Sequence, residues 1–180
     1  MQQEKKDEQE RKHLIRLLVT GGITLAIMVF IFVMSARDAD SSSRMSKGFL
    51  NSLIGSFLGR FLPKLSEKGA EYDIRKYAHM FEYCCLSISS FLFFREAFAG
   101  AARRCLSAVA CTLSLCVFYA STDEWHQTFV AGRAGRVSDV LVDTAGSLIG
   151  LAVVGLFCLL YEKSRRNRKR RAEVDSINCR

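Results

Sequence analysis

Charged and apolar residues are strongly segregated along this chain of 180 residues. The charged side chains gather at the two termini and in short connectors, and the stretches between them approach the ~20 apolar residues that the hydrocarbon core of a bilayer requires. There are four such stretches, at 17–36, 77–94, 105–122 and 138–161. A backbone in hydrocarbon must satisfy its own hydrogen bonds, so each stretch should be a helix. The sequence therefore predicts an all-α membrane protein, a bundle of four transmembrane helices.

The first apolar stretch has an alternative interpretation as a cleaved signal peptide. It follows a charged segment, 1–16, and it ends in the small residues Ser35 and Ala36. However, the apolar run from Leu17 to Met34 is longer than the roughly 7–15 residues typical of a signal peptide. This length favours a retained membrane anchor.

An even number of spans places both termini on the same side of the membrane. Lys and Arg are more numerous in the N-terminal segment, the connector after the second span and the tail 162–180 than in the loops on the other side. The positive-inside rule therefore predicts that both termini lie in the cytoplasm. We interpret the basic run from Lys163 to Arg171 as a topology anchor that attracts anionic lipids. It carries none of the aromatic residues that would favour nucleic acid as a partner.

The longest predicted outer loop, 37–74, contains one segment with helical periodicity. A polar, Ser-rich linker comes first, and apolar residues then recur at steps of mostly one and three between Met45 and Leu62, before Pro63. This pattern predicts an amphipathic helix over 45–62. Such a helix could lie in the outer membrane interface, or it could pack over the bundle as a lid.

The polar residues of the predicted spans are concentrated at their outer ends. Ionisable side chains are costly in a bilayer and by default indicate function. Twelve residues at these ends and in the adjoining connectors are our candidates for ligand binding: Arg75, Lys76, His79, Glu82, Tyr83, Asp123, Glu124, Gln127, Arg133, Arg136, Asp139 and Asp143.

Helical geometry predicts that these residues converge. At about 100° per residue, His79 and Glu82 share one face of the second span, and Asp139 and Asp143 share one face of the fourth. The stripe on the fourth span continues as Gly146-x-x-x-Gly150, which allows close helix approach. We therefore expect a polar site that is open to the outside and lined by three helices.

Three functions fit such a site. Arginines and carboxylates could form a purely structural ion-pair network that holds the helices together. Alternatively, Arg75, Lys76, Arg133 and Arg136 could hold the anionic head group of an amphiphile. Finally, His79 and Glu82 could be the acid/base pair of a membrane hydrolase or transferase, although no nucleophile stands out. A single His among carboxylates and arginines is a poor metal site, so we assign no metal and no cofactor.

The polar residues lie in three motifs that resemble the VanZ-like family of small integral membrane proteins. These are Arg-Lys-x-Ala-His-x-x-Glu-Tyr (75–83), Tyr-Ala-x-x-Asp-Glu-x-x-Gln-x-Phe (119–129) and Gly-Arg-x-x-Arg-x-x-Asp-Val-x-x-Asp-x-x-Gly (132–146). The Ser-rich segment 35–46 also resembles the outer linker of the family. Together the resemblance covers nearly the whole chain apart from the two charged tails.

The resemblance implies a protein of the bacterial cytoplasmic membrane. The family is named for an accessory protein of glycopeptide-resistance clusters that is associated with low-level teicoplanin resistance. Teicoplanin carries a fatty acyl chain, so a polar site beside an interfacial helix would suit such an amphiphile. The partners that we expect are therefore membrane lipids and a lipid-linked envelope precursor or lipoglycopeptide, and not nucleic acid.

Overall fold

The computed structural model describes residues 1–36, 70–101, 103–130, 133 and 135–178, except for the side chains of 70–75, 169 and 172–178. Within these residues there are four helices and no strand: α1 (Gln2–Ser35), α3 (Ala70–Ala97), α4 (Arg104–Gln127) and α5 (Val137–Asn178). The all-α class is thus confirmed. The amphipathic helix predicted over 45–62 falls outside the described residues.

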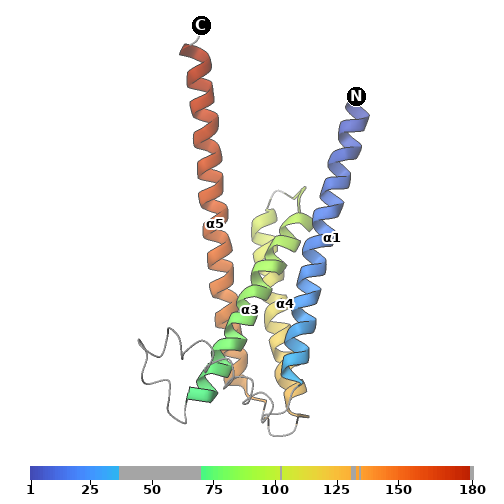
Figure 1. Cartoon of the computed structure of the whole chain (residues 1–180), viewed down its shortest axis with the longest axis vertical. Helices are drawn as coiled ribbons and strands as arrows, with labels where there is room; N and C mark the ends of the chain where they lie inside the picture. The colour runs from blue at the N-terminus through green and yellow to red at the C-terminus, as the bar shows by residue number, and fades with distance from the viewer. Residues whose placement is uncertain (37–69, 102, 131–132, 134, 179–180) are drawn as a thin grey trace, which may run out of the picture.

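The four helices form an elongated bundle in which α3 packs against α1, α4 and α5. Both ends of the chain lie at the same end of this bundle, where α1 and α5 extend beyond α3 and α4 (Figure 1). The opposite end brings together the C-terminal ends of α1 and α4 with the N-terminal parts of α3 and α5 (Figure 1). This second end carries the predicted polar site.

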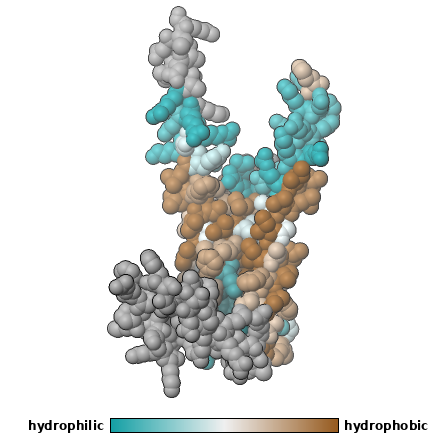
Figure 2. Space-filling model, viewed as in Figure 1, coloured by the Kyte–Doolittle hydropathy of each residue, from teal (hydrophilic) through white to brown (hydrophobic). Residues whose placement is uncertain are grey.

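Three helices, α1, α4 and α5, are long and apolar enough to cross a membrane. Figure 2 shows the corresponding band of hydrophobic surface, with hydrophilic surface on the extensions that carry the two termini. By the same measure α3 is not a candidate, because His79 and Glu82 and the buried residues Ser87 and Ser90 lower its hydropathy. The fourth transmembrane span at 77–94 therefore stays a prediction.

Two helices run well past the predicted spans into charged sequence. α1 begins at Gln2, and α5 continues to Asn178. These extensions contain no Gly or Pro and are rich in Glu, Lys and Arg, which are good helix formers. Ion pairs at i,i+4 support them, with Lys12 Nζ 2.5 Å from Glu8 Oε1 and Arg166 Nη2 3.7 Å from Glu162 Oε2.

Close backbone contact between α3 and α5 depends on two glycines. A Cβ on Gly146 would collide with the carbonyl group of Met80, and a Cβ on Gly150 would collide with the Ser87 hydroxyl and the Cys84 carbonyl oxygen. The close approach predicted for the Gly146-x-x-x-Gly150 motif is confirmed. Small residues allow membrane helices to gain van der Waals contact where no hydrophobic effect drives their association.

Candidate functional site

The polar site lies near the predicted outer boundary of the membrane. If Tyr161 and Arg104 mark the inner boundary, Asp143 and Asp123 lie about 27–29 Å along α5 and α4, close to the ~30 Å thickness of the hydrocarbon core. Counted from Arg95, Glu82 lies only about 20 Å along α3, which is about 10 Å inside the outer boundary. On these lengths, the predicted position of the site extends from head-group depth into the hydrocarbon layer.

Exposed aromatic side chains support this depth. Trp125 and Phe129, at the end of α4, are 67% and 70% exposed, and their ring centroids are 5.5 Å apart in an edge-to-face arrangement. Exposed Trp near a helix end is typical of the interface between lipid and water. The neighbouring residues Asp123, Glu124 and Gln127 are in contrast buried.

Asp123 is held by donors from two helices. Its Oδ2 atom accepts hydrogen bonds from the Ser35 hydroxyl at 2.8 Å and from Gln127 Nε2 at 2.9 Å. Its Oδ1 atom is buried and has no hydrogen-bond partner among the described residues. Because Ser35 is the last residue of α1, this carboxylate joins α1 to α4.

The connector between α4 and α5 folds onto the end of α4. The backbone N–H of Arg136 donates to Glu124 Oε2 at 2.9 Å, and Arg133 Nη2 lies 3.5 Å from the carbonyl oxygen of Met34. A Cβ on Gly135 would collide with the carbonyl oxygen of Glu124. The Arg133 side chain is partly buried in the site, whereas the Arg136 side chain is exposed.

Two ion pairs involve the polar end of α3. Lys76 Nζ lies 3.1 Å from Asp139 Oδ1 and thereby connects α3 to α5. Within α3, His79 Nδ1 lies 3.3 Å from Glu82 Oε2, and both side chains are mostly buried.

Asp143 is the most buried carboxylate of the site. It is 2% exposed, and its charge interacts with those of Glu82, Asp123 and Glu124. The site therefore gathers carboxylates from α3, α4 and α5 within electrostatic range of one another. Such a group of like charges needs cations or hydrogen-bond donors nearby to be stable in a protein interior.

Tyr83 lies at the inner limit of these carboxylates. Its side chain is fully buried, it interacts electrostatically with Asp123 and Asp143, and its hydroxyl has no hydrogen-bond partner among the described residues. Neighbouring Tyr119 instead donates its hydroxyl to the carbonyl oxygen of Met28, at 2.5 Å. Tyr83 is thus a buried polar group close enough to Asp123 and Asp143 to interact with their charges, and its hydroxyl is unbonded within the described part of the chain.

Of the twelve residues predicted from the sequence, the structure places eleven side chains at this end of the bundle; the side chain of Arg75 is outside the described part. The sequence analysis predicted that three helices line the polar site. The structure shows that α1 lines it as well, through Ser35. Buried Thr24, Ile31 and Ser35 recur every seven or four residues along one face of α1. That spacing was the available signal for a buried stripe ending in Ser35.

No group of three or more His, Cys, Asp or Glu residues in the described part could hold a metal ion. The expected absence of a metal and a cofactor stays a prediction.

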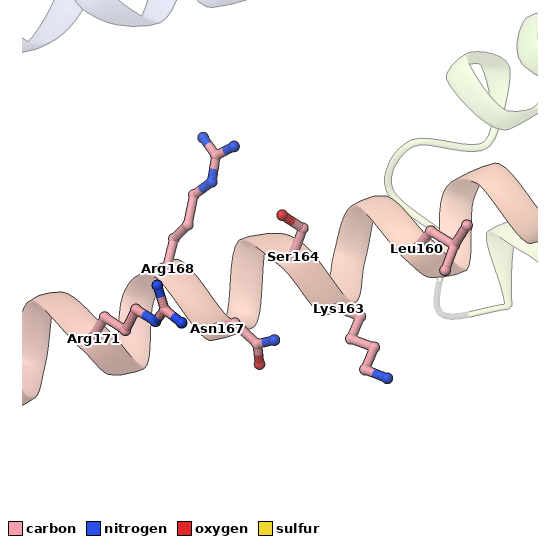
Figure 3. A pocket seen from close by; sticks show the side chains of 6 residues that line it. All are labelled: Leu160, Lys163, Ser164, Asn167, Arg168 and Arg171. Carbon is pink, nitrogen blue, oxygen red and sulfur yellow. The ribbon is translucent and has the colours of Figure 1, made fainter.

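The basic surface at the other end of α5 is not a binding site formed by several helices. Its lining residues, Leu160, Lys163, Ser164, Asn167, Arg168 and Arg171, all come from α5, and their side chains diverge around that helix (Figure 3).

Comparison with known proteins places most of the chain within one protein family. The family model described as VanZ/LLP1 matches residues 22–159, from the first apolar helix to the end of the apolar part of α5. No curated protein and no solved structure matches the chain.

Proposed function

Because the chain belongs to the VanZ/LLP1 family and carries helices apolar enough to cross a membrane, we propose that it binds the head group of a lipid-linked or lipopeptide amphiphile in its polar site. The proposed setting is the bacterial cytoplasmic membrane, with both termini in the cytoplasm and the site facing outward. The proposed physiological role is tolerance of glycopeptides such as teicoplanin, and this role rests on the family resemblance.

One observation carries the proposal of ligand binding. The Tyr83 hydroxyl and Asp123 Oδ1 are both buried at the site without a hydrogen-bond partner among the described residues. Buried polar groups are nearly always paired, and leaving one unpaired costs about 1–3 kcal/mol. A head group that donates to Asp123 and bonds to Tyr83 would recover this free energy on binding.

The depth of the site favours an amphiphile over a water-soluble ligand. The carboxylates of Asp123 and Asp143 lie near the predicted outer boundary, and Glu82 lies below it. A ligand with its acyl chain in the membrane would present its polar head at this level. We propose that Lys76, Arg133, Arg136 and Arg75 hold anionic groups of that head, while His79, Glu82, Asp139 and Asp143 accept from its hydroxyl or amine groups.

Thermal unfolding of the purified protein in detergent tests the proposal. We expect teicoplanin and a lipid-linked cell-wall precursor to raise the melting temperature, and deacylated teicoplanin to raise it much less. In Asp123→Asn and Arg133→Gln this stabilisation should be lost, whereas Ser121→Ala should retain it, because Ser121 is exposed and bonds only to its own helix. The absence of stabilisation by any of the acylated compounds would overturn the proposal.

A hydrolase or transferase acting on an envelope lipid is the second candidate. The observation that favours it is the distance of 3.3 Å between His79 Nδ1 and Glu82 Oε2, which brings two groups capable of acid/base chemistry together on α3. An enzyme should lose turnover in His79→Gln and Glu82→Gln while ligand-induced stabilisation is retained. Loss of binding without any turnover in the wild-type protein would favour the binding function.

A further inference from the structure

A groove lies between α1 and α3, at the end of the bundle opposite the polar site. It has a volume of about 250 Å³. One part of its lining is apolar, formed by Ile15, Val19 and Leu92, and the other part is charged. The charged residues are Arg16, Arg95 and Glu96.

The groove lies at the predicted inner boundary of the membrane. Arg16 is the last charged residue before the apolar run of α1, and Arg95 is the first charged residue after the apolar part of α3. The two helices are held together at this level, since His13 Nε2 is 3.0 Å from the carbonyl oxygen of Glu96. Phosphate groups of lipids lie at the same depth.

The charged part of the groove is suited to an anion. Arg16 is exposed and forms no ion pair with any described residue. Arg95 donates one N–H, from Nη1, to Cys158 Sγ at 3.0 Å, and a guanidinium carries five N–H donors. The two arginines outweigh the single carboxylate of Glu96, which leaves a net positive charge for a phosphate diester to neutralise.

The apolar part of the groove is suited to an acyl chain. Ile15 and Val19 are 49% and 54% exposed, on a helix long and apolar enough to cross a membrane. The Thr20 hydroxyl, which also lines the groove, donates to the carbonyl oxygen of Arg16 at 2.8 Å and so presents no free donor. Val19 and Leu92 lie three residues, about 4.5 Å, further into the apolar runs than Arg16 and Arg95, and apolar surface below two cations matches the arrangement of a phospholipid.

We infer that this groove binds an anionic phospholipid of the leaflet that faces the two termini. Its phosphate lies on Arg16 and Arg95, and the start of an acyl chain lies along Ile15, Val19 and Leu92. The site is separate from the polar site at the other end of the bundle and does not depend on the function proposed there. It ties α1 to α3 through a lipid, at the level where the N-terminal extension of α1 leaves the membrane.

Native mass spectrometry of the full chain tests this inference. The protein is released from detergent in the presence of phosphatidylglycerol or of phosphatidylcholine with the same acyl chains. We expect the wild-type protein to retain phosphatidylglycerol preferentially. Arg16→Gln should weaken this retention about tenfold, the usual effect of losing a charge-assisted hydrogen bond. Arg11→Gln is the matched control, because Arg11 is exposed on the same helix but does not line the groove.

Two further measurements keep the test decisive. Val19→Trp, which fills the apolar part without changing a charge, should also reduce the retention of phosphatidylglycerol. Excess inorganic phosphate should not displace the lipid. Equal retention of the two lipids by the wild-type protein, or undiminished phosphatidylglycerol retention by Arg16→Gln, would overturn the inference. Displacement by inorganic phosphate would show an anion site and not a lipid site.

Discussion

The ring centroids of Tyr83 and Tyr119 lie 6.3 Å apart between α3 and α4, yet only one of the two hydroxyls is bonded to a described residue. Tyr119 donates to the carbonyl oxygen of Met28 and so fastens α4 to α1. Tyr83 is fully buried, and its hydroxyl has no partner among the described residues. Two chemically identical groups at one helix interface therefore differ in their bonding, and the proposed ligand would bond to the Tyr83 hydroxyl, which has no partner among the described residues.

The two tyrosines provide a matched test of this difference. Tyr119→Phe should lower the free energy of unfolding by about 1 kcal/mol or more, because it removes a hydrogen bond and leaves the Met28 carbonyl without that donor. Tyr83→Phe should leave the stability unchanged or raise it, because it removes an unpaired buried hydroxyl. Both changes can be measured by thermal unfolding in detergent. A larger loss in Tyr83→Phe than in Tyr119→Phe would show that the Tyr83 hydroxyl is paired in the folded protein.

The glycines of α5 offer a second matched pair. Gly146→Ala should destabilise the protein by about 1–3 kcal/mol, since the new methyl group would collide with the backbone of Met80 and force α3 and α5 apart. Gly155→Ala should be neutral or stabilising by up to about 1 kcal/mol, because nothing lies within 4 Å of its Cβ position and Ala favours the helix. Equal melting temperatures for the two variants would contradict the close packing described here.

The hydrogen bond from Ser35 to Asp123 predicts that α1 is a permanent part of the bundle. Ser35→Ala should cost about 1–3 kcal/mol, because it removes one of the two donors to a buried carboxylate oxygen. Ser121→Ala, at an exposed position, is the control and should change the stability by less than about 0.5 kcal/mol.

Intact mass measurement of the purified protein completes this test. The mass should include residues 1–35, as expected for a retained anchor and not for a signal peptide. Loss of α1 from the mature protein, with the remaining helices still folded, would contradict the role assigned to Ser35.

The helix class and the location of the polar site were predictable from the sequence because both follow from local patterns. Long apolar runs require helices in a membrane, and a helical period of about 100° places His79 with Glu82 and Asp139 with Asp143. That Gly146 and Gly150 allow close helix approach was predictable for the same reason, whereas the helix that they contact was not. Each of these features needs information only from one segment of the chain.

The contribution of α1 was harder to predict because it depends on contacts between distant segments. Ser35 and Asp123 are 88 residues apart, and nothing in the sequence near Ser35 shows that a carboxylate lies opposite. Backbone acceptors also cannot be predicted from residue type. Met28 and Met34 accept hydrogen bonds through their carbonyl oxygens, which every residue carries. Helix ends were missed for another reason, since charged residues continue α1 and α5 beyond the apolar spans.

The ion pair between Lys76 and Asp139 distinguishes a binding site from a purely structural network. Its side chains are 29% and 24% exposed, so water screens the pair and its net contribution to stability should be small. A double-mutant cycle with Lys76→Met, Asp139→Asn and the double variant should give a coupling energy of about 0.5–1 kcal/mol in thermal unfolding. The more exposed pair formed by Lys12 and Glu8, with side chains 59% and 63% exposed, is the reference, and its coupling energy should be smaller.

The same variants, measured for the rise in melting temperature that the ligand causes, distinguish a binding site from a structural network. If the site binds an anionic head group, Lys76→Met should reduce the stabilisation by teicoplanin more than it reduces the stability of the protein alone, because the lysine is needed chiefly when the ligand is present. A structural network predicts the reverse. Removal of either partner would then cost about 3–5 kcal/mol, as found for buried ion pairs, and the ligand would have no effect of its own.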